Sequence, residues 1–489
     1  MLLLFHEPAK IHALSHSPPP FANSAPWDSR GRQPPSRHPL LYTPAATPQD
    51  ALLCWHSRPV TDFHTAATRS GVPKSASRVT NKPERTPQLI PPSGRIVAID
   101  VVRGFAILWV ILYHLWTDIK IENARSVPDT FRFVPHQLTH DPPATFTAVS
   151  DAFFRIGFLG VPLFMILSGL SLTMVAMRRE PRPRETPRFL YRRLRRVMIP
   201  YWFGFAYTLA FATVLAVIQW QRHGGDSYAW FVRHGDVRIN GGQLFAGGLL
   251  VPRFWSRAWQ FAPEGSLWFV LLIVQYYLLF PLLLPLLKRI GPWWFLAAAF
   301  TVTFISLNCI VAVDGNLLNA NSWVETLAPF RIFEFALGMA GGYLMIKRPE
   351  LLLEYTRAPL DILSIVVLGL LLFVGGNMID LDSGDLVTFQ SPMIALGLSL
   401  IFLPLVCKLP GRLEVSAPGR MFAWVGVVSY TVLIVNEPLR SVTHTMYIDH
   451  ASDAWRALWV GAIYMPVTLI AARPLAVLLG LVQREPGGA

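Results

Sequence analysis

The chain has 489 residues, of which 52% are hydrophobic and only 15% charged, and this balance argues against a soluble domain and for a polytopic membrane protein. The net charge of +13 does not indicate a nucleic-acid-binding protein, because the basic residues lie in a proline-rich N-terminal stretch and in short segments between apolar runs. The cysteines, Cys54, Cys309 and Cys407, have neither metal-ligand nor disulfide spacing, and we assign them no role.

Residues 1–94 are rich in proline, serine, arginine and histidine and have no apolar periodicity. Such a segment cannot bury enough apolar surface to offset its chain entropy, so we predict a disordered tail. The opening MLLLF is too short for the core of a signal peptide. The next methionine after Met1 is Met165, and two interpretations stay open: a genuine cytoplasmic tail, or a true start near Val72 or Val79.

The first apolar segment, residues 96–116, is long enough to cross a bilayer but carries Asp100, Arg103 and His114. An ionisable group at membrane depth costs roughly 2.5–3.5 kcal/mol on insertion scales, so its presence needs a reason. In a helix Arg103 and His114 share one face, because their spacing turns the chain about 20° past three full turns, with a rise of about 16 Å. Asp100 joins this face and can pair with the guanidinium. The sequence therefore predicts a polar stripe that ends in a titratable imidazole.

From residue 95 to residue 480 the sequence predicts an all-α membrane helix bundle with about ten transmembrane helices, followed by a short cytoplasmic tail at 481–489. The apolar segments are 96–116, 153–175, 197–219, 266–287, 293–313, 329–346, 359–376, 392–407, 421–439 and 456–478.

The distribution of arginine predicts the orientation of this bundle. Residues 178–196 contain nine arginines, and the positive-inside rule places them in the cytoplasm. Alternating crossings then put both termini in the cytoplasm, Arg103 in the inner half of the membrane and His114 in the outer half. We expect a multi-pass protein of the plasma or inner membrane. The loop 220–265 fits least well, and we interpret its short apolar stretch 241–251 as interfacial or re-entrant.

Five motifs along the chain resemble those of the acyltransferase family 3 membrane proteins. The first segment has the arginine, ten intervening residues and histidine of that family's first helix. The others are GFLGVPLFMILSGLSL (157–172), RFLYRRLRRVMIPYW (188–202), PFRIFEFALGM (329–339) and WVGVVSYTVLIVNEPL (424–439). Together they cover the chain from about residue 95 to 480.

The resemblance implies transfer of an acyl group, with acetyl expected, from acyl-CoA to a hydroxyl of a cell-surface or lipid-linked carbohydrate, without a permanently bound cofactor. A sugar hydroxyl is a weak nucleophile, so a base with a near-neutral pKa must take its proton, and histidine is such a base. His114 is the candidate base; the alternative is a neutral histidine hydrogen-bonded to a neighbouring helix. Arg103 suits a phosphate, a carboxylate or an oxyanion, and the alternative is an internal ion pair with Asp100.

A basic cluster precedes the third apolar segment. Facing the cytosol, it can hold the phosphates of CoA. The alternative, which applies to most of the arginines in this stretch, is that they fix topology and bind anionic lipid headgroups. The cluster consists of Arg192, Arg193, Arg195 and Arg196, which form Arg-x-x-Arg pairs.

Candidate contacts to the acceptor are Glu264, Trp268, Tyr430 and Asn436. Glu264 is alternatively an ordinary exposed loop carboxylate. Asn436 stands where many members of the family have histidine, and an amide cannot act as a base. In the same way Gln275 stands where similar family members often have glutamate, so this chain lacks a negative charge at that position.

Two further groups are assigned no catalytic part. Arg331 and Glu334 are three residues apart in the sixth segment, where we predict a structural ion pair. His136 and His140 share a loop, but the prolines beside them oppose a helix that would align them as ligands, so we predict no metal site.

The competing classes are a glycan or lipid transporter, such as a flippase, and a membrane scaffold or sensor. Transporters often have internal repeats, and we find none in this sequence. Nothing in a scaffold requires the Arg103 and His114 stripe. Expected partners are membrane lipid and a hydroxyl acceptor; exopolysaccharide, lipopolysaccharide, a lipid-linked sugar and a small secreted metabolite all fit as that acceptor.

Overall fold

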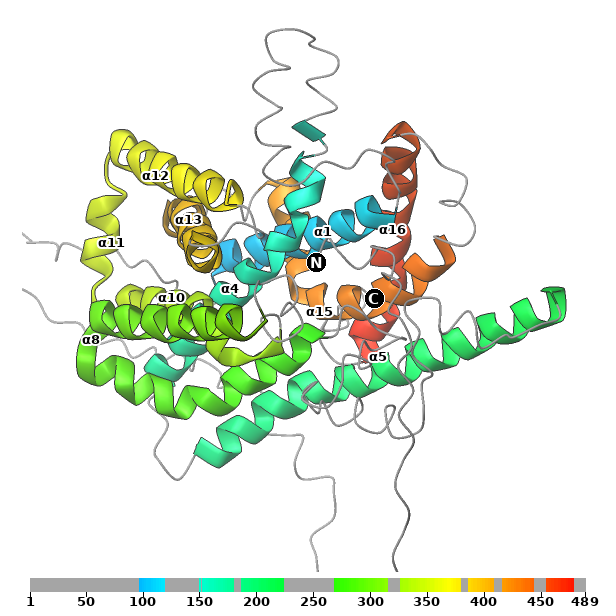
Figure 1. The fold of residues 1–489 in the computed structure, drawn as a ribbon, viewed down its shortest axis with the longest axis horizontal. Coiled ribbons are helices and arrows are strands. Elements are labelled where there is room, and N and C mark those ends of the chain that lie inside the picture. The colour runs from blue at the N-terminus through cyan, green and yellow to red at the C-terminus, as the bar shows by residue number, and fades with distance from the viewer. Residues whose placement is uncertain are drawn as a thin grey trace, which may run out of the picture. The chain divides into compact units, whose positions relative to one another are not determined.

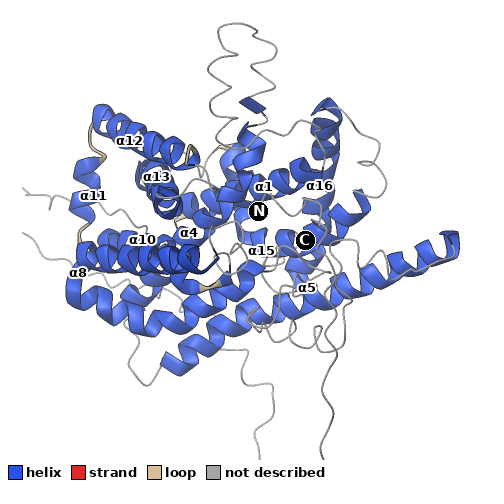
Figure 2. Cartoon of the chain, viewed as in Figure 1, coloured by secondary structure: helices blue, strands red, loops and turns tan. Residues whose placement is uncertain are grey.

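The computed structural model describes residues 96–118, 149–150, 152–179, 186–223, 268–314, 326–379, 386–408, 416–443 and 454–478. These residues are helical almost throughout, with no strand among them (Figures 1 and 2). The predicted all-α fold is confirmed. The predicted tail at 1–94, most of the loop 220–265 and the tail at 481–489 lie outside the described residues.

Each predicted apolar segment overlaps a helix in the described part of the chain, and α8 contains two of them. A short helix, α11, lies in a stretch for which we predicted a loop. The elements are α1 (Val97–Asp118), the 3-10 helix η1 (Ile156–Leu159), α4 (Gly160–Arg179), α5 (Thr186–His223), α8 (Trp268–Asp314), α10 (Ala328–Lys347), α11 (Pro349–Tyr355), α12 (Pro359–Asn377), α13 (Val387–Lys408), α15 (Ala417–Thr443) and α16 (Ala454–Leu478).

The long helix α8 consists of two arms that meet at Gly291. Gly291 has φ 81° and ψ 167°, a conformation that glycine adopts without steric cost, and Pro292 follows it. Because proline lacks a backbone N–H, it favours a new helix start at this point. The break comes directly after Lys288 and Arg289, where the charge pattern predicts a cytoplasmic loop.

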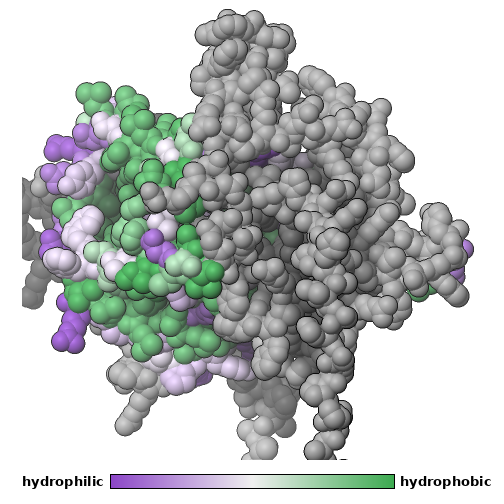
Figure 3. All heavy atoms as spheres, viewed as in Figure 1, coloured by the Kyte–Doolittle hydropathy of each residue, from purple (hydrophilic) through white to green (hydrophobic). Residues whose placement is uncertain are grey.

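Six stretches of the described helices are long and apolar enough to cross a membrane. One of them, Phe269–Val313, is 45 residues long, about twice the length of a single crossing. Apolar side chains also cover much of the coloured surface in Figure 3, and Leu282 and Leu371 are 70% and 66% exposed. Such exposed apolar surface fits contact with lipid, so the protein is a multi-pass membrane protein. α5, α10 and α16 are not among the six stretches, and the total of ten crossings stays a prediction.

Glycines join the helices in pairs. At each pair a side chain on at least one of the two glycines would overlap the backbone of the opposite helix, and on Gly369 it would lie only 3.0 Å from the Gly397 oxygen, so the backbones approach closely. Such close approach is how membrane helices gain packing contacts where no hydrophobic effect drives them together. Among the described helices the pairs are Gly104 with Gly426 (α1 and α15), Gly169 with Gly338 (α4 and α10), and Gly369 with Gly397 (α12 and α13).

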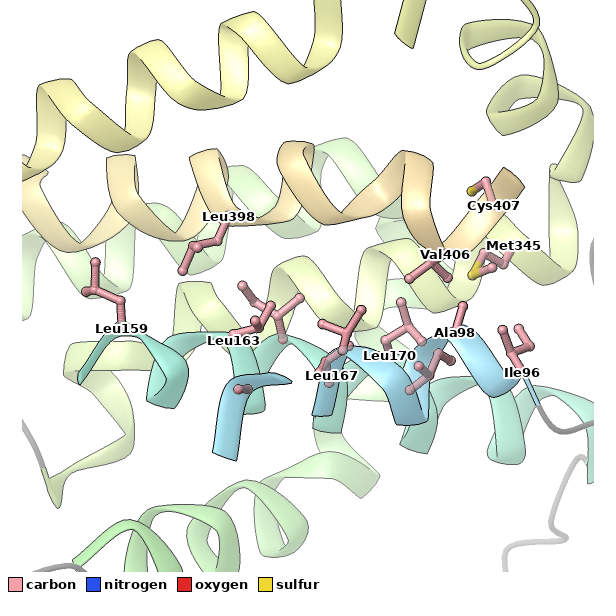
Figure 4. Close-up of a cluster of buried hydrophobic side chains, with 14 of the residues drawn as sticks. Ile96, Ala98, Leu159, Leu163, Leu167, Leu170, Met345, Leu398, Val406 and Cys407 are labelled. Atoms are coloured by element: carbon pink, nitrogen blue, oxygen red, sulfur yellow. The ribbon is translucent and has the colours of Figure 1, made fainter. Parts of the chain in front are cut away.

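One hydrophobic core connects the pairs (Figure 4). Leu163 and Leu167 of α4 pack in it with Leu398 of α13 and Met345 of α10, and the start of α1 contributes Ala98. This core fixes α1 and α4 inside the bundle, and these are the two helices that carry the candidate site.

Candidate active site

The predicted polar stripe lies on α1, which is one uninterrupted helix. α1 packs against η1, α4, α13, α15 and α16, so other helices enclose it (Figure 1). Asp100 and His114 are buried, with exposed fractions of 8% and 9%. Regular helix geometry puts Arg103 and His114 on one side, about 16 Å apart along the axis. The imidazole therefore lies inside the bundle and does not face lipid.

α4 runs antiparallel to α1 and places a serine opposite the arginine. Gly157 lies against Trp109, whereas Gly160 lies against Ala106, about one turn earlier on α1. Further along α4, Ser171 consequently comes opposite the first turns of α1.

The Arg103 guanidinium is held from two helices. Its Nη1 donates a hydrogen bond to Asp100 Oδ1 over 3.4 Å, within α1. Its Nη2 donates a shorter bond, 2.7 Å, to Ser171 Oγ on α4. The predicted pairing of Asp100 with Arg103 is thus present, and Ser171 adds a contact that sequence spacing could not supply. The whole Arg103 side chain, including its methylene groups, is 29% exposed.

Two more helices bring polar groups toward Arg103. Tyr277 of α8 and Arg196 of α5 lie near enough to act electrostatically on the guanidinium. Two guanidinium groups therefore share a neighbourhood with one carboxylate, Asp100. This excess of positive charge favours binding of an anion near Arg103.

The basic cluster lies entirely on α5, which begins at Thr186, well before the third apolar segment. Arg192, Arg195 and Arg196 are exposed. Arg193 is half-buried, and its guanidinium lies over the Phe189 ring at 5.6 Å. Three of the four predicted phosphate-binding arginines thus face outward, while Arg193 packs on its own helix.

At Trp116, near the end of α1, the structure adds a residue that we did not predict. Arg155, just before η1, is only 1% exposed, and its guanidinium lies 4.6 Å from the centre of the Trp116 ring. The contact is a cation–π interaction, which gains strength when the cation is desolvated. The rule that singled out Arg103, a charged residue inside an apolar segment, applies equally to Arg155 and could have found it.

Tyr430 and Asn436, predicted to contact the acceptor, make contacts within the bundle. The Tyr430 hydroxyl donates to the backbone oxygen of Val197, which ties α15 to α5 over 3.1 Å. Asn436 is 1% exposed, and its Oδ1 lies 2.8 Å from the hydroxyl of Tyr464 on α16. Its Nδ2 is buried and makes no hydrogen bond within the described residues.

Gln275 anchors the start of α10. Its Nε2 donates to the Thr326 oxygen over 2.7 Å, and its Oε1 accepts the Ala328 N–H over 3.0 Å. An ionised glutamate could accept but not donate here, so the amide fits this position better than the carboxylate that the family resemblance led us to expect. The substitution of a neutral residue is therefore explained by local hydrogen bonding.

The predicted Arg331 and Glu334 pair is present in α10, with 3.7 Å between Nε and Oε1. Ser391 of α13 also donates to Glu334 Oε1 over 3.0 Å. Both side chains are nearly buried, and the group links α10 to α13, in keeping with a structural part.

Three predicted features lie at residues or side chains that the structure does not describe. Glu264, and the loop with His136 and His140, lie outside the described residues. Trp268 begins α8, but its side chain is not described. The described residues contain no group of three or more His, Cys, Asp or Glu side chains that could hold a metal ion.

Comparison with known proteins identifies the family. The family model of acyltransferase family 3, described as an acyltransferase domain, matches residues 96–477. A Caenorhabditis elegans protein named regulator of hypoxia-inducible factor 1 is 26% identical over 223 residues, which are 45% of this chain and 39% of that relative. This chain therefore covers less than half the length of that relative. No solved structure matches the chain. Because the family model covers most of the chain, this protein belongs to acyltransferase family 3.

Proposed function

We propose that this protein is an integral membrane O-acyltransferase that moves an acyl group, with acetyl expected, from acyl-CoA to a hydroxyl of a cell-surface or lipid-linked carbohydrate. One observation carries the proposal. A member of an acyltransferase family has, on one face of a buried helix, a guanidinium fixed by Asp100 and Ser171 and a buried imidazole, His114.

In the proposed reaction His114 acts as the general base. As the acceptor oxygen attacks the thioester carbonyl carbon, its proton passes to the imidazole. The carbon–sulfur bond breaks, and the CoA thiolate leaves and is then protonated. The products are an ester and free CoA, so the reaction needs no oxidant or reductant.

Arg103 stabilises negative charge on the donor in this mechanism. A guanidinium presents several N–H groups in one plane, which suits a phosphate of the bound CoA, whereas the thioester carbon must lie near His114, about 16 Å further along α1. The phosphates of CoA would bind the exposed arginines of α5, and the electrostatic influence of Arg196 on Arg103 supports one donor site that includes both the cluster and the stripe.

The orientation follows from the same arginines. With the α5 cluster in the cytoplasm, acyl-CoA reaches Arg103 from the inner side of the plasma membrane, and His114 lies toward the outer side. Both termini are then cytoplasmic, and an acceptor at the outer surface meets the base at the far end of the stripe.

The direct test is replacement of His114 by glutamine, which keeps a hydrogen-bonding side chain but removes the base. Purified protein is incubated with labelled acetyl-CoA and a panel of carbohydrate acceptors, and CoA release and labelled acceptor are measured. We expect the rate to fall by about a hundredfold or more, because general base catalysis contributes about 10²–10⁴. Membrane insertion and thermal unfolding should match the wild type.

Two results would count against the proposal. Unchanged acylation in His114→Gln would remove His114 from the mechanism. A wild-type protein that releases no CoA with any acceptor, but moves a labelled glycan or lipid across a vesicle membrane, would identify a transporter.

A further inference from the structure

Ser171 makes a short polar contact between α4 and α1. Its Oγ accepts the 2.7 Å hydrogen bond from Arg103 Nη2 and donates its own proton to the Leu167 oxygen, also over 2.7 Å. Because the hydroxyl proton is committed to the preceding turn of α4, the lone pairs of Oγ point away from that turn and toward the guanidinium. The hydroxyl is thereby oriented as an acceptor.

Asp100 alone cannot fix the direction of the guanidinium. It lies on the same helix as Arg103 and makes a bond of 3.4 Å, close to the upper limit for a hydrogen bond. A contact within α1 also leaves the guanidinium free to turn relative to α4. Ser171 supplies the second point, from the other helix, at the other terminal nitrogen.

We propose that Ser171 is a positioning residue, which holds the Arg103 guanidinium so that its remaining N–H groups face the acyl donor. A guanidinium has five N–H donors, one of which goes to Asp100 and one to Ser171. In this proposal the other three N–H groups meet the ligand. This inference rests on the proposed function, because it assigns a direction to a group that the reaction uses.

A matched pair of substitutions separates the hydroxyl from the shape of the side chain. Ser171→Thr keeps an Oγ that can bond to the preceding turn, and Ser171→Val has nearly the same shape without any acceptor. Ser171 is only half-buried, so both variants have room for the added methyl group. We expect Ser171→Val to lower kcat for acetyl-CoA by about tenfold to a hundredfold, as loss of a hydrogen bond to a charged group does, and Ser171→Thr to restore most of it.

A double-mutant cycle with Arg103→Lys shows whether Ser171 acts through the guanidinium. A lysine ammonium cannot bridge Asp100 and Ser171, so Ser171→Val should cause no further loss in the Arg103→Lys background. A purely structural serine would give independent losses that multiply. Thermal unfolding of all variants in detergent serves as the control for folding.

The outcomes divide cleanly. Suppose that the wild-type protein is active. If Ser171→Val and Ser171→Thr then have equal kcat, or if the losses in the double-mutant cycle multiply, the assignment of Ser171 is overturned and the proposed function still stands. A wild-type protein that neither binds nor turns over acetyl-CoA would overturn the proposed function, and the assignment with it.

Discussion

Replacement of Gly426 by alanine tests the contact that places α1 in the bundle. A methyl group at this position would overlap the Asp100 backbone oxygen and lie 3.0 Å from the Gly104 nitrogen. Both atoms belong to backbone, which cannot rotate away as a flexible side chain can, so α1 and α15 must separate. Overpacking of this kind costs typically about 1–3 kcal/mol. Alanine recovers about 1 kcal/mol through its higher helix propensity, which leaves a net loss of stability of up to about 2 kcal/mol.

Gly341→Ala is the matched control. Gly341 is also a helical glycine, but a methyl group there would meet only a Leu170 methyl at 3.6 Å, an ordinary contact. It should gain up to about 1 kcal/mol from helix propensity alone. Unfolding of both variants in detergent measures the difference.

Gly426→Ala should also reduce catalysis, because Asp100 moves with α1 while Ser171 stays on α4. A displacement of about 1 Å in an active site can cost about a hundredfold in rate. If Gly426→Ala unfolds at or above the wild-type temperature and acylates at the normal rate, close packing of α1 on α15 does not hold the site together.

Two other predictions concern α8 and α5. Gln275→Glu should destabilise the protein by about 1–3 kcal/mol, because the Thr326 oxygen loses its donor. Gln221→Glu, at an exposed position of α5, is the control and should have little effect. Unfolding midpoints that shift equally in the two variants would contradict this explanation. Replacing both Arg192 and Arg196 by alanine should raise KM for acetyl-CoA about tenfold or more. Arg357→Ala, at an exposed position before α12, is the control and should leave KM unchanged. If the acetyl-CoA titrations of the wild type, the double variant and the control overlay, the cluster does not bind the donor.

The sequence was sufficient for what depends on local pattern. Apolar segments of membrane length predicted the helices, and the three-residue spacing predicted the pairing of Asp100 with Arg103. The break at Gly291 falls between the predicted apolar segments 266–287 and 293–313, beside Lys288 and Arg289. Each of these features depends on neighbours in the chain.

Contacts between distant residues could not be predicted in the same way. Ser171 is 68 positions from Arg103, and Tyr464 is 28 from Asn436, so their pairing depends on how helices pack. Gln275 shows the reverse difficulty: comparison with similar sequences indicated only a missing charge, whereas the folded chain uses both ends of the amide. Arg155 was within reach of the rule applied to Arg103, since it too lies inside an apolar segment.

The glycine contacts also set limits on how the bundle can move. Where two backbones touch, neither helix can slide or tilt without a steric clash. We therefore expect three helix pairs each to move as one rigid unit: α1 with α15, α4 with α10, and α12 with α13. Arg103 and Ser171 belong to different pairs, but α1 and α4 also touch, because a methyl group on Gly160 of α4 would overlap the Ala106 backbone oxygen of α1. The hydrogen bond between these two side chains therefore joins helices whose backbones are already in contact, and we expect its geometry to change little when a ligand binds.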